Sequence, residues 1–111
     1  MRKVEFTEQE KEFIKLFIVA NSLADDRVYN RSGHEFEFDK DNLPFLGDMS
    51  LFVTVSLWEE IFFVDPPETP TVKQRVVQKL EIWLMQDGEQ VETNLDFEFE
   101  EQIKIELINT K

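Results

Sequence analysis

The side chains best suited to chemistry gather around the single histidine of the chain. His34 is followed by Glu35, Glu37, Asp39 and Asp41, a combination that could attract a metal ion. Alternate residues of a strand, however, point the same way and lie about 7 Å apart. A metal ion needs oxygens that converge at roughly 2.0–2.6 Å, so we expect no metal and no cofactor here.

Catalytic motifs are missing from the sequence. The chain has no cysteine, which excludes a cysteine nucleophile, a cysteine zinc site and disulfides. There is no G-x-S-x-G elbow and no phosphate-binding G-x-x-x-x-G-K-[ST] loop. The 24 acidic residues include no pair that the sequence singles out for acid–base work. We therefore interpret His34 as structural and expect the protein not to be an enzyme.

Acidic residues recur at alternate positions in two places. If both segments are strands, their carboxylates repeat at about 6.6–6.8 Å, a spacing similar to that of successive phosphates along a nucleic-acid strand. One hypothesis is an inhibitor of the phage counter-defence type, which mimics nucleic acid and blocks a basic DNA- or RNA-handling protein. The plainer alternative is the solvated face of an amphipathic strand. The two rows are Glu35, Glu37 and Asp39, and Asp96, Glu98 and Glu100.

Aromatic residues support a second hypothesis. Trp58 and Trp83 are predicted to point to the opposite face of their strands from the apolar residues that alternate around them. Trp58 is predicted to share its face with Phe52. If that face of the sheet is uncovered, these rings are exposed, and exposed tryptophan is enriched at protein–protein hot spots. The protein would then be an assembly or immunity-type interaction partner, with a homodimer as one form. Burial by a second layer remains open as well.

The net charge of the chain limits the kinds of partner that it can bind. Twenty-four acidic against twelve basic residues give a net charge of −12. Such a chain repels nucleic acid and anionic membranes, so we expect a protein partner with a basic surface. The acidity is equally consistent with solubility alone. The polar N-terminus and the lack of an apolar run of about 20 residues favour the cytoplasm of a bacterium or of a phage-infected host cell.

The N-terminal third predicts a helix. After a short strand over Arg2–Phe6, Thr7 and Glu10 match a capping box. The apolar residues that follow recur at the helical period and are predicted to face the core, widened by Ile14 and Ile18. The predicted stripe is Phe13, Leu16, Phe17, Ala20, Leu23 and Ala24.

The middle of the chain predicts strands. His34–Asp39 alternates, with Phe36 and Phe38 inward. A strand over Leu51–Trp58 follows a loop, and Ile61–Val64 is predicted as a separate strand after an interruption at Glu59 and Glu60. A homodimer or a covering helix should protect these apolar strands. The prolines that should then break regular structure are Pro66, Pro67 and Pro70.

The segment from Thr71 fits a helix or a strand, and the turn that follows decides for a strand. Asp87-Gly88 is a strong hairpin signal. If Asp87 and Gly88 form a two-residue turn, the numbers of any two residues that face each other across the hairpin add up to 175. Apolar residues then face apolar ones, and Lys79 and Arg75 face Asp96 and Glu100. We predict that the second strand continues through Leu107, with a bulge at Glu100–Gln102. The apolar pairs are Leu84 with Val91, Leu80 with Leu95, and Val76 with Phe99.

Residues 1–111 therefore predict one α+β domain. An N-terminal helix packs on a twisted, mainly antiparallel sheet, which contains a hairpin that turns at Asp87-Gly88.

Overall fold

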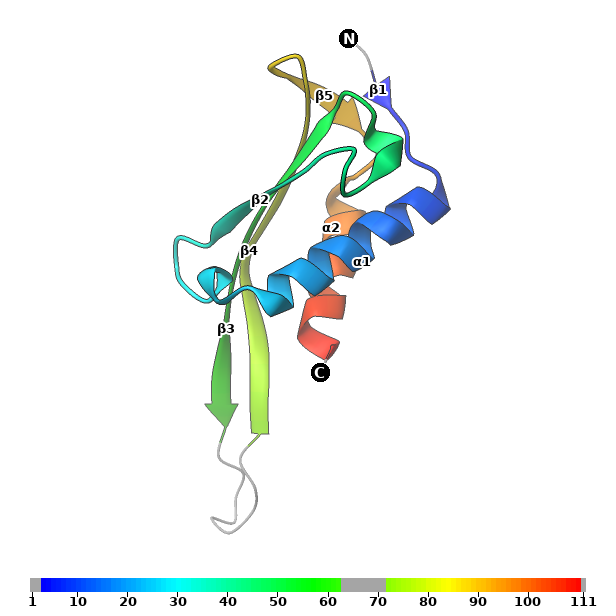
Figure 1. Cartoon of the computed structure of the whole chain (residues 1–111). Coiled ribbons are helices and arrows are strands. Elements are labelled where there is room, and N and C mark those ends of the chain that lie inside the picture. Colours follow the sequence, from blue (N-terminus) through cyan, green and yellow to red (C-terminus); the bar gives the residue numbers. More distant parts are fainter. Residues whose placement is uncertain (1–2, 63–71, 111) are drawn as a thin grey trace.

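A computed structural model describes residues 3–62 and 72–110 (Figure 1). The fold is α+β, with one helix near each end of the chain and a five-stranded mixed sheet between them. In chain order the elements are β1 (Lys3–Val4), α1 (Glu8–Ala24), η1 (Asp26–Val28), β2 (His34–Phe38), η2 (Pro44–Leu46), β3 (Ser50–Phe62), β4 (Val72–Gln86), β5 (Glu89–Thr93) and α2 (Phe97–Asn109).

The strands lie in the order β1-β5-β4-β3-β2. All neighbours are antiparallel except β1 and β5, which run parallel. Both helices lie on the same side of the sheet (Figure 1). We call that side the inner face, and it carries the buried residues Leu51, Val53, Val55, Leu80 and Leu84.

The capping box of α1 is present as predicted. The Thr7 hydroxyl accepts a hydrogen bond from the Glu10 amide at 3.1 Å, and the Glu10 carboxylate accepts one from the Thr7 amide at 2.8 Å. Reciprocal bonds of this kind satisfy two amides that the first turn of a helix leaves unpaired. The predicted start of the helix is therefore confirmed.

The buried side of α1 differs from the prediction. Ile14, Ile18 and Ser22 are fully buried, whereas Phe13 is 50% and Leu16 55% exposed. Apolar residues surround most of this helix, so periodicity alone could not decide which side meets the sheet. The predicted stripe, which included Ala20 and Ala24, mostly faces solvent.

β2 matches the predicted strand, but β3 does not match two predicted strands. β3 runs without a break through Glu59 and Glu60. The irregularity lies at Ser56 and Leu57, which face Lys79 and Val77 of β4 and so leave one β4 residue between them unpaired. The Ser56 hydroxyl donates to the backbone oxygen of Asn30. Val64 and the three predicted strand-breaking prolines lie outside the described residues.

β4 is a strand, and the hairpin turns at Asp87 and Gly88. Both residues have positive φ, 53° and 78°, as the tight turns of two-residue hairpins require. Gln86 faces Glu89, and Leu84 faces Val91. The register between these two strands ends with that pair, and β5 continues only to Thr93, where it pairs with β1.

The predicted continuation of that strand is wrong, since residues 97–109 form α2. Asp96 is the N-cap, and its carboxylate accepts a hydrogen bond from the Phe99 amide at 3.1 Å. Phe99, Ile103 and Leu107 are buried. Their spacing of four residues suits one side of a helix as well as one side of a strand. The predicted bulge at Glu100–Gln102 therefore does not exist, and neither do the predicted pairs of Leu80 with Leu95, Val76 with Phe99, Lys79 with Asp96 and Arg75 with Glu100.

Two long-range contacts tie the ends of the chain to the sheet. The amide of Phe6 donates to the side-chain oxygen of Asn94, and the Asn94 side-chain nitrogen donates back to the Phe6 oxygen, both at 2.9 Å. Arg75 Nη1 on β4 donates to the backbone oxygens of Leu107 and Thr110 at the end of α2. A cation at this end of a helix complements the helix dipole.

Candidate functional site

The outer face of the sheet, on the side away from both helices, carries two large rings. Phe52 on β3 and Trp83 on β4 face each other directly, and both are half-buried. Their chain neighbours point to the inner face, because successive strand residues alternate. Glu35 and Met85 line the same shallow depression. Figure 1 shows both helices on the opposite side of the sheet, so no described helix covers these rings.

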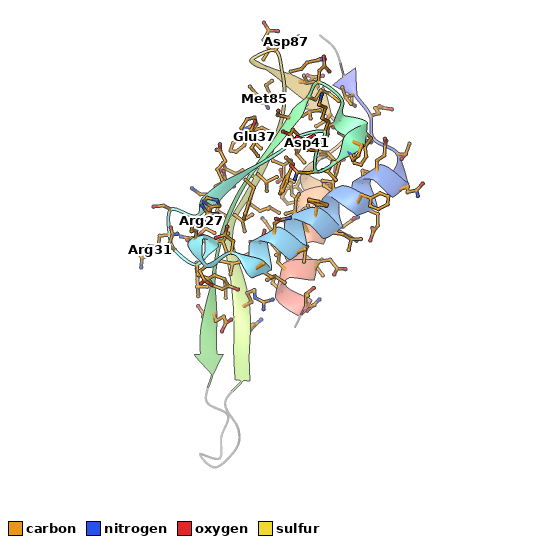
Figure 2. All side chains as sticks on the ribbon, in the orientation of Figure 1. Arg27, Arg31, Glu37, Asp41, Met85 and Asp87 are labelled. Atoms are coloured by element: carbon orange, nitrogen blue, oxygen red, sulfur yellow. The ribbon has the colours of Figure 1, made fainter. Side chains whose placement is uncertain are left out.

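Carboxylates flank the two rings. Glu37 on β2 faces Phe52, while Glu35 on β2 and Glu81 on β4 both face Thr54 of β3 from opposite sides. All three carboxylates are exposed. Within residues 3–62 and 72–110 no cation forms an ion pair with any of them. Figure 2 marks Glu37 and Met85, which belong to this surface. We call the surface formed by Phe52, Trp83, Met85, Glu35 and Glu37 the outer patch.

Trp58 lies apart from the outer patch. It follows the irregularity at Ser56 and Leu57, faces Val76, and is 37% exposed. Its indole nitrogen donates to a Glu60 carboxylate oxygen at 3.0 Å. The predicted aromatic interface is therefore divided, with Phe52 and Trp83 together and Trp58 on the part of β3 beyond β2.

The first acidic row is shorter than predicted. Glu35 and Glu37 are exposed strand residues, but Asp39 follows the end of β2 and is only half-exposed. The Asp39 carboxylate accepts a hydrogen bond from the Asp41 amide at 2.9 Å and so shapes the turn. Two carboxylates of this row, rather than three, remain available to a partner.

The second acidic row is not a strand. Asp96, Glu98 and Glu100 occupy the N-cap and first turn of α2, where negative charge stabilises a helix. Glu98 is exposed, whereas Glu100 is partly buried, and this burial raises its pKa. The row therefore has a structural explanation that the strand prediction did not provide.

The N-termini of the two helices lie close together. Glu8, Lys11 and Glu12 of α1 line one hollow with Asp96 and Glu98 of α2. Lys11 Nζ lies 2.9 Å from a Glu8 carboxylate oxygen, and this hydrogen bond raises the pKa of Lys11. Lys11 therefore neutralises part of the negative charge in this hollow, and the acidic residues lie at the starts of the two helices.

His34 has a packing role in the structure. Its ring meets the ring of Phe36 edge to face, with centroids 4.8 Å apart. In the part of the chain that the structure describes, no three histidine or acidic side chains are arranged to hold a metal ion.

Sequence reasoning missed one apolar surface, the solvent side of α1. Phe13, Leu16 and Ala20 are exposed there. The buried side carries a second stripe at the same helical period, Ile14, Ile18 and Ser22, so the pattern of apolar residues gave no signal that separated the two sides. The stripe that the sequence predicted to face the core is the one that mostly faces solvent in the fold.

Comparison of the chain with protein-family models, with curated proteins and with solved structures finds no match in any of the three. Among the helices in residues 3–62 and 72–110, none combines the length and the apolar character needed to cross a membrane.

Proposed function

We propose that this protein is a non-catalytic protein-binding domain of the cytoplasm. It binds a partner with a basic surface through the outer patch. The observation that supports this proposal most directly is the pair of facing rings, Phe52 and Trp83, on a sheet face that neither of the described helices covers.

The chemistry of the outer patch suits such a partner. Large aromatic side chains bury about 150–250 Å² each and dominate the energetics of interfaces. Rim carboxylates add little affinity, but they steer a basic partner and exclude acidic ones. The net charge of −12 acts in the same direction at longer range. It also disfavours a homodimer through this face, because two copies would bring equal charges together.

A narrower form of the proposal is a mimic of nucleic acid that inhibits a DNA- or RNA-handling protein, as phage counter-defence proteins do. The supporting observation is that Glu35 and Glu37 are exposed at alternate positions of β2, which places them about 6.6–6.8 Å apart. This form requires that the partner's nucleic acid and the outer patch compete for the same cleft.

Affinity capture from a bacterial lysate, with and without nuclease treatment, tests the proposal. Tagged protein is compared with Trp83→Ser and with the matched control Trp58→Ser, which removes the other tryptophan. Both variants are first checked for an unchanged fold by thermal unfolding. We expect the same basic proteins to bind the wild type and Trp58→Ser, and to be lost from Trp83→Ser.

Two further measurements separate the alternatives. Binding of the purified partner is repeated with increasing double-stranded DNA or RNA, and competition supports the mimic form. Sedimentation of the protein alone reports self-association. Equal capture by all three proteins, or capture that nuclease treatment abolishes, contradicts the proposal.

A further inference from the structure

β2 is an edge strand, and its outer edge is available to another strand. It ends the strand order and pairs only with β3 among the described strands. The backbone groups of an edge strand that point away from the sheet are a template for a further strand. Proteins and peptides use such edges by adding a strand from a partner.

The two sides of β2 differ chemically. Glu35 and Glu37 point to the outer face and are exposed, while Phe36 points to the inner face and is only half-buried. The Phe36 ring stacks on the Phe38 ring, with centroids 5.9 Å apart. A strand next to β2 would therefore meet carboxylates on one side and an aromatic surface on the other.

Helix α1 presents apolar residues on the side toward this edge. Phe17 of α1 packs edge to face on Phe38 of β2, with centroids 5.7 Å apart. On the opposite side, Glu8 and Lys11 of α1 lie against α2. Phe13, Ala20 and Ala24 lie four, three and seven positions from Phe17, share its side of the helix and are exposed. Ile14, which also lies three positions from Phe17, is buried, so only part of this side is uncovered. An inward side chain of an added strand would cover part of this flank.

We infer that β2 accepts a strand from the partner, and that this strand alternates basic residues beside Glu35 and Glu37 with apolar residues beside Phe36. The inference rests on the proposed function, because it specifies the segment through which the partner binds. It also accounts for the exposed apolar flank of α1.

A second copy of this chain does not fit the edge. Two β2 strands that pair antiparallel about Phe36 would place Glu35 of each copy opposite Glu37 of the other. Like charges directly opposite each other destabilise a strand pair. The same carboxylates attract a strand whose outward residues are lysine or arginine.

Synthetic peptides test the inference without a known partner. The probe is a labelled nine-residue peptide that alternates lysine and valine. The controls are the same peptide with glutamate for lysine, one of equal composition with the lysines and valines in separate blocks, and one N-methylated at alternate amides. Fluorescence anisotropy measures affinity, and amide shifts in NMR spectra locate the contact. We expect binding of the first peptide alone, with the largest shifts at residues 34–38.

Charge reversal provides the second test. Glu35→Lys with Glu37→Lys should lower the affinity for the lysine–valine peptide by about tenfold or more. The same variant should allow the glutamate–valine peptide to bind. The matched control, Glu89→Lys with Glu106→Lys, changes two exposed acidic residues elsewhere and alters the net charge equally. It should leave the peptide preference unchanged.

The outcomes distinguish the two proposals. The strand inference is overturned if the N-methylated or the block peptide binds as tightly as the first peptide. It is also overturned if the control variant weakens peptide binding equally, or if the NMR shifts lie away from β2. No binding of any peptide also overturns it. In each case, loss of the captured partner from Trp83→Ser would leave the proposed function standing, whereas unchanged capture would overturn that as well.

Discussion

Arg75 on β4 donates a hydrogen bond to the backbone oxygen of Leu107 in the last turn of α2. The same nitrogen donates to Thr110 at 2.7 Å. One guanidinium thus satisfies two carbonyl groups that the end of a helix leaves unpaired, and it joins the C-terminal helix to the sheet.

Arg75→Met should destabilise the fold, because it removes these bonds and keeps most of the apolar stem. Hydrogen bonds to charged groups contribute about 1.5–3 kcal/mol each, so we expect the loss of both bonds to lower the free energy of unfolding by about 3 kcal/mol or more. Urea unfolding measures it. Gln74→Met, at the exposed neighbouring position, should change stability by less than about 0.5 kcal/mol. Equal effects of the two substitutions would show that the bonds to α2 do not stabilise the fold.

Two glycines with similar backbone angles should respond differently to alanine. Gly88 and Gly33 have φ of 78° and 75°. A Cβ on Gly88 would meet no atom within 4 Å, whereas a Cβ on Gly33 would lie 2.7 Å from the backbone oxygen of Val55. Gly88→Ala should therefore cost about 1–2 kcal/mol from the backbone angle alone.

Gly33→Ala should cost clearly more than Gly88→Ala, because β3 must also move. Urea midpoints of the two variants, compared with wild type, give the difference. A Gly33→Ala variant as stable as Gly88→Ala would mean that the turn before β2 shifts without loss.

Lys79 and Asp96 should be energetically independent. Lys79 lies on the outer face of β4, while Asp96 caps α2 on the inner side. Asp96→Ala should cost about 0.5–2 kcal/mol, the usual value of a helix cap, and Lys79→Glu little. Denaturation of the two single variants and the double variant should give a coupling energy below about 0.5 kcal/mol. A larger coupling would favour the strand pairing that the sequence predicted.

Asp25 should titrate at unusually low pH. Its carboxylate accepts hydrogen bonds from the side chain and the backbone of Arg27, and these lower its pKa from 3.8 to about 2. Figure 2 marks Arg27, which lies in η1, after the end of α1. Since the folded pKa is the lower one, the contribution to stability is present above about pH 4 and is lost as pH falls toward 2.

Carboxyl NMR titration measures this pKa directly. Arg27→Gln should return the pKa of Asp25 toward 3.8, and Arg31→Gln, which changes another arginine near the start of β2, should not. An unchanged Asp25 pKa in Arg27→Gln would contradict the assignment of its cause.

Binding to the partner should depend on salt. Exposed charges are screened beyond about 8 Å at physiological ionic strength, so the rim of the outer patch should lose its effect between about 50 and 500 mM salt. The Kd of the captured partner, measured across this range, should rise for wild type and change less for Glu35→Lys with Glu37→Lys. A Kd that is constant with salt would leave the aromatic pair as the sole basis of binding.

Local chemistry made some elements predictable. The capping box at Thr7 and Glu10, the alternation of β2 and the turn at Asp87 and Gly88 each depend on residues close in sequence, and the structure contains all three. The position of Trp83 on the outer face followed from the alternation of side chains along the strand alone.

Tertiary packing decided the rest. Phe99, Ile103 and Leu107 fit two periods, and the helix is favoured there because Asp96 caps it and Arg75 binds its end. An aspartate before an acidic first turn was a usable signal for this helix. No local signal determines which side of α1 is buried, since that depends on where β2 and α2 lie.

The paired amide bonds between Phe6 and Asn94 join residues 88 positions apart. During synthesis at about 5–20 residues per second, about 4–14 s separate the appearance of the end of α1 from that of Asn94. Throughout that interval β1 lacks its partner strand β5, and the first helix lacks α2 to pack against. Phe6 and α1 therefore gain their contacts with Asn94 and α2 only after this interval, although Phe17 of α1 can meet Phe38 of β2 earlier. Until then, a nascent-chain binding factor could reach the apolar residues that α2 later covers.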